Sequence, residues 1–468
     1  MPRPTRRTVL TATAAAALSP PMALGQRRST KPNILLIFPD QLRAQALSLY
    51  GETNIDTPVF DALLRESVHF ERTYAANPVC APSRASLLTG LYPTAHQVNE
   101  NGDRLPEGTH TLATQLQRAG YHTGYIGKWH LDGNDKPGFV PPSRRHGFEW
   151  WAAYNSGHKY RNAVYFRDKP EALYPTPVDR FEPELQVDLA FEFLEQAHER
   201  TDPWFLMMSF GPPHPPGSTP IKDWGLDIPQ RWLEAVNPAQ LSFNPNVPKG
   251  IHEPYTNKKG NLSYPGARHH LHGYYAAVLA LQHAIERLLK GLHDRGLDGE
   301  TLVVLASDHG EMGGAHGQFK KGMPYEEALR VPLCFRWPGH LQPRSIRAPT
   351  SLVDVAPTLA SLAGAPFEQH QGFDLCETLY SGEVVRKGGV LALGRVGRPD
   401  EWAAIRGPRY LYAEFEDQRP KTRWLFDNQS DPFQLHNLAG DPATRATQRR
   451  LARELKKRRR AVKRGQAV

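Results

Sequence analysis

Several side chains that could do chemistry follow short apolar runs of the sequence. The runs are Ile34 to Phe38, Tyr121 to Ile126, Phe205 to Phe210 and Leu302 to Ala306. The polar residues that follow them, in the same order, are Asp40 with Gln41, Lys128 with His130, His214, and Asp308 with His309. A single His or Asp after a strand is usually a turn or capping residue. Four such sets at one edge of a sheet would instead form a site rich in carboxylates, imidazoles and an amine.

A further candidate, Cys80, begins a predicted helix. Cys80-Ala81-Pro82-Ser83-Arg84 leads into a helical stretch that ends at Gly90, and Pro82 lies at an early position where helices tolerate proline. The unpaired N–H groups and the dipole at a helix N-terminus favour an anion. Arg84, one turn later on the same face, can donate two hydrogen bonds to an oxyanion. This segment is therefore suited to sulfate or phosphate.

The elements that must position these side chains alternate between predicted strands and helices. The four apolar runs are typical of buried parallel strands, whose ligands bind at the carboxyl ends. Amphipathic stretches predict helices at Leu112 to Ala119, Val187 to Ala197 and Tyr274 to Leu292. Short strand-like pieces follow after about Asp374, at Gly389 to Leu393, Tyr410 to Glu414 and Trp424 to Asp427. We expect an α/β fold with a large, mostly parallel sheet covered by helices on both faces, and a smaller C-terminal antiparallel sheet subdomain.

With Cys80, Pro82 and Arg84 matching the signature Cys-x-Pro-x-Arg, the sequence resembles the formylglycine-dependent (type I) sulfatases of the alkaline phosphatase superfamily. The resemblance covers nearly the whole chain after the first 30 residues. Similar motifs occur in family order at Asn33 to Gln41, Gly127-Lys128-Trp129-His130, Gly211-Pro212-Pro213-His214, Ser307-Asp308-His309-Gly310, Lys321 with Tyr325-Glu326, and Leu425-Phe426-Asp427.

The resemblance implies a modified nucleophile and one divalent metal. A separate formylglycine-generating enzyme would oxidise Cys80 to 3-oxoalanine (formylglycine), whose hydrate attacks sulfur and then expels sulfate. The implied metal ligands are Asp40, Gln41, Asp308, His309 and the modified residue 80. This mostly oxygen set favours Ca²⁺, and the imidazole leaves Mn²⁺ or Mg²⁺ open. Family members often carry Asp in place of Gln41 and Asn in place of His309, so this site has one fewer negative charge.

Four further residues resemble the family's sulfate-binding and proton-transfer groups. They are Lys128, His130, His214 and Lys321. We expect His214 to protonate the leaving group with help from Lys321, and His130 to assist removal of the diol proton. Lys320 adjoins Lys321 and either could be a surface charge, but the spacing to Tyr325-Glu326 favours Lys321.

The ends of the chain carry separate signals. Residues 1–25 read as a twin-arginine signal peptide, with Arg6-Arg7, an apolar run and a small-residue cleavage site, so we expect a periplasmic or secreted protein. We divide the remainder into a catalytic domain (31–375), a C-terminal subdomain (376–445) and a basic tail (446–468). Arg449 to Arg464 hold ten Lys or Arg against Glu454, while the whole chain has a net charge of +9. A solvated, partly helical tail is favoured over contact with an anionic polymer or lipid. We infer no nucleic-acid binding and expect no membrane span.

Three functions from different classes follow. The first is hydrolysis of a sulfate ester in a sulfated small molecule or polysaccharide, with a sulfated glycan favoured. The second is phosphonate monoester or phosphodiester hydrolysis, since related enzymes with the same modified cysteine share the Asp-Gln and Asp-His pairs. The third is an inactive, polyanion-binding homologue, which the intact set of candidate residues argues against.

Overall fold

The computed structural model describes residues 31–161, 163–171, 173–175, 180–216, 224, 227–256, 263–264, 266–386, 388–416 and 422–468. The predicted signal peptide lies outside the described residues. Among the helices that are described, none is long and apolar enough to cross a membrane.

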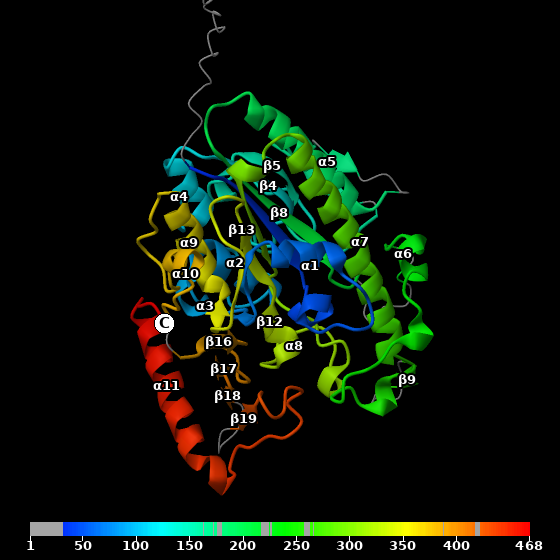
Figure 1. Cartoon of the computed structure of the whole chain (residues 1–468), viewed down its shortest axis with the longest axis vertical. Helices are drawn as coiled ribbons and strands as arrows, with labels where there is room; N and C mark the ends of the chain where they lie inside the picture. The colour runs from blue at the N-terminus through cyan, green and yellow to red at the C-terminus, as the bar shows by residue number, and fades with distance from the viewer. Residues whose placement is uncertain are drawn as a thin grey trace, which may run out of the picture.

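A large mixed sheet forms the centre of the molecule (Figure 1). In the described chain it has ten strands, in the order β14 (Arg344–Ile346), β2 (Val68–Phe70), β13 (Leu333–Arg336), β11 (Thr301–Ala306), β1 (Asn33–Asp40), β8 (Trp204–Pro213), β4 (His122–Lys128), β5 (Trp150–Tyr154), β6 (Val164–Phe166) and β7 (Leu173–Pro175). The five central strands, β11 to β5, are mutually parallel. Antiparallel pairing is confined to the flanks, at β11–β13, β13–β2, β5–β6 and β6–β7. The four predicted strands are all central, so their polar followers share one edge.

Helices cover both faces of this sheet, as the sequence predicts. Side chains alternate along β1, so Leu35 and Ile37 pack on one face and Ile34 and Leu36 on the other. The first face is covered by α1 (Pro58–Arg65), α5 (Glu182–His198) and α7 (Gly266–Asp294), and the short helix α6 (Gln230–Glu234) packs against α7. The second is covered by α2 (Cys80–Thr89), α4 (Leu112–Arg118), α9 (Val355–Leu362) and α10 (Cys376–Ser381). The mostly parallel, doubly covered fold is thus confirmed.

Smaller elements connect the central sheet to the C-terminal part. A three-stranded sheet has the order β12 (Arg330–Val331), β3 (Thr73–Tyr74) and β15 (Thr350–Ser351). Two short helices are α3 (Pro93–His96) and α8 (Glu326–Leu329), and α8 directly precedes β12. Separately, β9 (Tyr255–Thr256) pairs with β10 (Ser263–Tyr264).

The C-terminal part is a four-stranded antiparallel sheet with two covered faces. Its strands are β16 (Val390–Gly394), β17 (Trp402–Arg406), β18 (Tyr410–Phe415) and β19 (Arg423–Asp427). One face packs on Met312, Tyr325 and Leu329 of the catalytic part. The other face packs on the long helix α11 (Arg445–Lys463), which lies along the outside of the sheet (Figure 1). The predicted subdomain is confirmed, and the basic tail proves to be an ordered helix packed on it.

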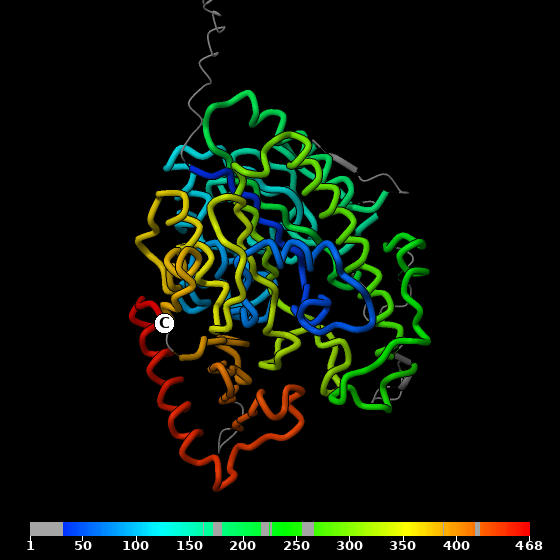
Figure 2. The backbone as a smooth tube through the Cα atoms, viewed as in Figure 1, coloured from blue at the N-terminus to red at the C-terminus, as the bar shows by residue number. Residues whose placement is uncertain are grey.

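The end of the described chain returns to the catalytic part, as the backbone trace shows (Figure 2). The N–H of Val468 donates to the carbonyl of Gln371 at 3.0 Å. The Gln371 side chain donates to the carbonyl of Val462 at 2.7 Å, and its N–H donates to the carbonyl of Gly90 at 2.7 Å. Gly90 directly follows α2, so these bonds join helix α11 to the segment behind Cys80.

Candidate active site

Two acidic residues meet where β1 and β11 end side by side. Asp40 is the last residue of β1, and Gln41 follows it with a φ of 68°, which turns the chain out of the sheet. The N–H of Gln41 donates to Asp308 Oδ1 at 2.8 Å, and the N–H of Leu42 donates to Ser307 Oγ at 2.9 Å. These bonds fix the ends of two adjacent parallel strands, which brings both carboxylates into one fully buried cluster.

Cys80 is the first residue of α2, and its thiol points at this cluster. Its Sγ lies 3.1 Å from His309 Nε2 and 3.8 Å from Asp40 Oδ1. The helix runs to Thr89 and ends at Gly90 with a φ of 65°, as predicted. The N–H of Ala81 is already bonded to Asn101 Oδ1 at 3.1 Å, and Pro82 has no N–H. Few backbone donors therefore remain, and an anion here depends mainly on side-chain cations.

Arg84 lies beneath the two carboxylates and is only 1% exposed. Its Nη1 donates to the carbonyl of Lys128 at 2.8 Å and to Ser209 Oγ at 2.7 Å. Its Nη2 lies 3.3 Å from Asp40 Oδ2 and 3.2 Å from Asp308 Oδ2. The guanidinium thus holds the acidic pair in place, and direct binding of an oxyanion by Arg84 stays a prediction.

Two lysines contact the cluster. Lys128, the last residue of β4, places Nζ 2.6 Å from Asp40 Oδ2, with both side chains fully buried. Lys321 places Nζ 3.1 Å from Cys80 Sγ and 2.6 Å from Gln41 Oε1. The choice of Lys321 over Lys320 agrees with this geometry. The Gln41 amide also donates to Glu311, so both ends of its side chain have protein partners, and its role as a metal ligand stays a prediction.

His214 has a partner that the sequence did not reveal. It follows β8, and its ring stacks on His158 with 3.6 Å between ring centroids. His158 Nε2 lies 3.4 Å from Lys128 Nζ, so a third imidazole joins the site. His158 follows β5, a central parallel strand that the apolar-run pattern did not single out. The polar segment Ser156-Gly157-His158 after Trp150 to Tyr154 is the signal that would have found it.

The side chain of His130 contacts Asp135. Its Nε2 is 2.7 Å from Asp135 Oδ1, and no contact in the described residues joins it to Cys80 or Asp40. Removal of a proton from residue 80 by His130 therefore stays a prediction.

The site strongly perturbs its ionisable groups. Burial raises the pKa of Asp40, but Lys128, His214 in its protonated form and Arg84 outweigh it and hold that pKa well below its usual value. Burial and Asp40 raise the pKa of the Cys80 thiol, yet Lys128 and Lys321 together with His309 lower it well below its ordinary value. Burial, His158 and Lys321 lower the pKa of His214 well below that of free histidine, so its imidazole is neutral at pH 7. These shifts favour anions at the centre and a neutral histidine at its border.

The ligand geometry fits a divalent cation. One donor atom from each of Asp40, Cys80, Asp308 and His309 lies within 4.8 Å of the other three, and all four residues are buried. Asp308 Oδ2 accepts no hydrogen bond from the described residues, but Arg84 Nη2 lies 3.2 Å from it, so a cation here would share this oxygen with the guanidinium. Two carboxylates and an imidazole suit Ca²⁺, Mn²⁺ or Mg²⁺.

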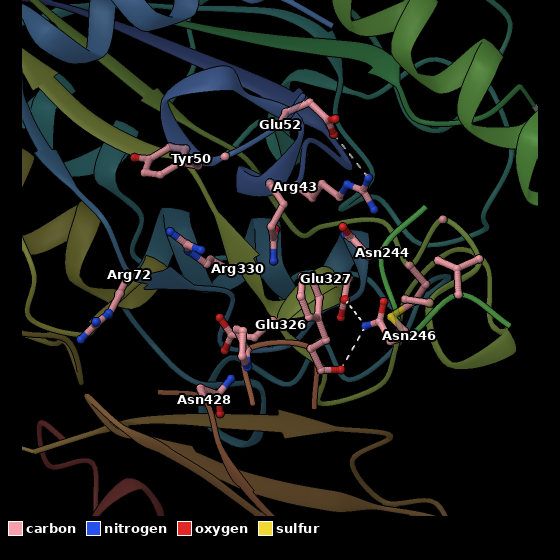
Figure 3. A pocket seen from close by; sticks show the side chains of 18 of the residues that line it. Arg43, Tyr50, Glu52, Arg72, Asn244, Asn246, Glu326, Glu327, Arg330 and Asn428 are labelled. Carbon is pink, nitrogen blue, oxygen red and sulfur yellow. Dashed lines mark hydrogen bonds and ion pairs between the residues drawn. The ribbon is translucent and has the colours of Figure 1, made fainter. Parts of the chain in front are cut away.

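A separate polar cavity of about 700 Å³ lies between the catalytic part and the C-terminal sheet (Figure 3). Arg43 Nη2 lies 3.9 Å from Glu52 Oε2 there, and Asn246 donates to Glu327 Oε1 at 2.6 Å. None of the predicted site residues lines it. This cavity is therefore distinct from the site around Cys80.

Comparisons with known proteins identify the family of the chain. The sulfatase family model matches residues 32–365. An ulvan-active sulfatase from Formosa agariphila is 34% identical, over 92% of this chain and 82% of the relative. An endo-4-O-sulfatase from Bacteroides thetaiotaomicron is 28% identical, over 88% of each chain. The solved structure of a YidJ sulfatase homologue from Bacteroides fragilis superposes with a TM-score of 0.82 at 27% identity, covering 94% of this chain and 97% of that one. The chain therefore belongs to the sulfatase family of the alkaline phosphatase superfamily, and it is a sulfuric ester hydrolase.

Proposed function

We propose that this sulfatase hydrolyses a sulfate ester of a sulfated glycan, with residue 80 in the formylglycine form and with one divalent metal. The observation that carries the proposal is the convergence on one buried atom, Cys80 Sγ, of His309 Nε2 and Lys321 Nζ, each at 3.1 Å, beside Asp40. A group at this position lies beside a cation, an imidazole and side chains that could bind a metal, which is the environment that activates a nucleophile.

The Sγ of Cys80 stands where an oxygen of the hydrated aldehyde would lie. A thiol is a poor partner for a hard cation, whereas a hydrate oxygen matches the other donors. Asp40, Asp308 and His309 would hold the metal with residue 80. The metal, when bound, supplies a positive charge that polarises a sulfate oxygen.

The side chains of this chain supply the remaining steps. Lys128 and Lys321 place two ammonium groups at the cluster, where they neutralise the charge of a sulfate ester. Burial is the main reason that His214 is neutral in the free enzyme, and His158 and Lys321 lower its pKa further. A bound sulfate would offset the Lys321 charge and so raise the pKa of His214. His214 would then carry a proton near the leaving oxygen, as a general acid requires.

The glycan assignment rests on relatives and not on the geometry of the cluster. One relative is named as a sulfatase active on ulvan and another as an endo-4-O-sulfatase, and they match 92% and 88% of this chain. The test is turnover of defined sulfated saccharides and of an aryl sulfate by protein made with a formylglycine-generating enzyme. We expect sulfate release from both, and the tryptic peptide Thr73–Arg84 should show the thiol replaced by a carbonyl. Full turnover by protein that carries only unmodified Cys80, or by Cys80→Ser, contradicts the mechanism.

The second candidate function, phosphonate monoester or phosphodiester hydrolysis, is favoured by one feature. Gln41 and His309 replace an acid and an amide, which lowers the negative charge around the cluster. Comparing kcat/KM for 4-nitrophenyl sulfate and 4-nitrophenyl phenylphosphonate separates the two, and we expect the sulfate to be preferred.

We also propose that Ca²⁺ is the metal and that the chain is exported with its twin-arginine signal. The support for Ca²⁺ is the oxygen-rich donor set. The support for export is the Arg6-Arg7 motif with its apolar run and cleavage site. Elemental analysis of native protein and fractionation of the native host test the two points.

A further inference from the structure

We propose that helix α11 is a docking surface for sulfated polysaccharide chains, which tethers the enzyme to the polymer that carries its substrate. The proposal rests on the glycan substrate proposed above and adds a second contact with it, away from the site.

The first observation is the one-sided charge of α11. Nine cationic side chains on α11 and on Arg464, which directly follows it, are exposed. They are Arg445, Arg449, Arg450, Arg453, Lys456, Lys457, Arg460, Lys463 and Arg464. At about 100° per residue they fall within an arc of roughly 140°. Within that arc no acidic residue occurs, since Glu454, the acid of the helix, lies outside it.

The second observation is that the opposite side of the helix is used internally. Leu451, Leu455 and Val462 are buried against strands β16 to β18. Arg459 forms ion pairs with Glu401 at 2.9 Å and Glu416 at 3.1 Å. The helix is therefore fixed with its cationic arc outward, and this arrangement differs from a mobile tail.

The third observation is that the arc works against the stability of the helix. Cations four residues apart repel, as in Arg445/Arg449/Arg453, and cations near a helix N-terminus oppose the helix dipole. The first turn contains no acid. A face used only for solvation would alternate its charges, whereas a bound polyanion removes this repulsion.

The structure favours a polysaccharide over a membrane. A helix that lies on a bilayer buries an apolar face in it. The apolar face of α11 is already covered by the C-terminal sheet. A hydrophilic polyanion needs only the charged arc.

The position of the helix connects docking to catalysis. The sheet beneath α11 packs on the segment that carries Lys321, where Trp402 Nε1 donates to the carbonyl of Gly322 at 3.0 Å. A polymer held on α11 raises the effective concentration of its other sulfate groups near the site.

The test uses the full chain and immobilised dextran sulfate, with unsulfated dextran as the blank. The docking variant is Arg449→Gln/Arg453→Gln/Lys456→Gln/Arg460→Gln. The matched control removes four exposed cations elsewhere: Arg65→Gln/Arg231→Gln/Lys290→Gln/Arg347→Gln, whose side chains are 65%, 58%, 72% and 81% exposed. We expect the docking variant to bind at least about tenfold more weakly, with a shallower dependence on salt, and the control to bind like the wild type.

Turnover of 4-nitrophenyl sulfate should be the same in all three proteins, which shows that the fold and the site are intact. If the docking variant unfolds, Lys456→Gln/Arg460→Gln replaces it, with a smaller loss expected. Equal binding by wild type and docking variant, or an equal loss in the control, overturns the proposal. Tighter α11-dependent binding to anionic vesicles or to DNA than to dextran sulfate overturns the choice of a polysaccharide. If none of the proteins releases sulfate, the proposed function is wrong. Retention on dextran sulfate does not need turnover, so it still tests the docking surface separately.

Discussion

Replacing Lys128 with methionine separates what this lysine contributes to folding from what it contributes to catalysis. Its Nζ lies 2.6 Å from Asp40 Oδ2, and both side chains are fully buried. Removing one partner of a buried ion pair leaves the other charge uncompensated, at about 3–5 kcal/mol. Because Arg84 Nη2 remains 3.3 Å from the same oxygen, we expect the low end, about 3 kcal/mol.

Lys321→Met is the matched comparison, since it removes the same charge from the same cluster. Lys321→Met leaves behind the neutral Gln41 carbonyl, at 2.6 Å from Nζ, and the group at position 80, whose Sγ lies 3.1 Å from Nζ in the unmodified chain. A lost hydrogen bond to a charged donor costs about 1.5–3 kcal/mol, and here we expect the lower value. Each variant should lose about 10²- to 10³-fold in kcat on an aryl sulfate, as for removal of a fixed donor to developing charge.

The assay is urea unfolding in EDTA, which removes a metal that would otherwise compensate Asp40, followed by the same experiment with Ca²⁺. In EDTA, Lys128→Met should be the less stable variant, by about 1–2 kcal/mol. Saturating metal should narrow the difference. If Lys128→Met proves as stable as Lys321→Met in EDTA, the assignment of Lys128 as the main counter-charge of Asp40 is refuted.

Three further predictions test other parts of the site. His214→Ala should slow aryl sulfates with poor leaving groups far more than those with good ones, because a leaving group of low pKa needs no proton; an equal loss across the series would assign His214 to sulfate binding. Chelation, or Asp308→Ala, should abolish turnover, because the remaining ligands leave the cation poorly compensated; full activity of metal-free protein, verified by elemental analysis, would exclude a metal role. Burial raises the pKa of Glu182 from 4.5 to about 7, so the folded state binds more protons than the unfolded state between these values. Stability should fall as pH rises through that window, by about 3 kcal/mol at most, and Glu182→Gln should abolish this decline in unfolding experiments at pH 5 and pH 8.

The sequence predicted the centre of the fold well because hydrophobic periodicity is strongest in buried strands. Each apolar run that it singled out is a central parallel strand, and each polar follower lies at the shared edge. The central strand β5 (Trp150–Tyr154), the flanking strands and β17 (Trp402–Arg406) escaped notice, since short strands without regular alternation resemble loops. The residue types after each strand were enough to identify Asp40 and Asp308 because two adjacent parallel strands must end together.

The sequence could not show which hydrogen-bond partner each polar group of the site has. The Gln41 side chain is engaged by Lys321, and the N–H of Ala81 is engaged by Asn101. Neither partner is adjacent in the sequence. The apolar seam of α11 was visible as Leu451, Leu455 and Val462, but the density of cations around it suggested a solvated end. Packing against the C-terminal sheet decides that question, and it is a tertiary effect.

The bonds that join Val468 and Val462 to Gln371, and Gln371 to Gly90, have a consequence for biosynthesis. Cys80 is 1% exposed in the folded chain, so an oxidising enzyme must reach it before the fold closes. The 388 residues that follow Cys80, through Val468, take about 20 to 80 s to translate, at roughly 5–20 residues per second. Until these residues have left the ribosome, the C-terminal sheet cannot pack against the segment that carries Lys321. The hydrogen bonds of Gln371 with Val462 and Val468 cannot form either. The chain order therefore provides an interval in which the oxidation that we propose can take place.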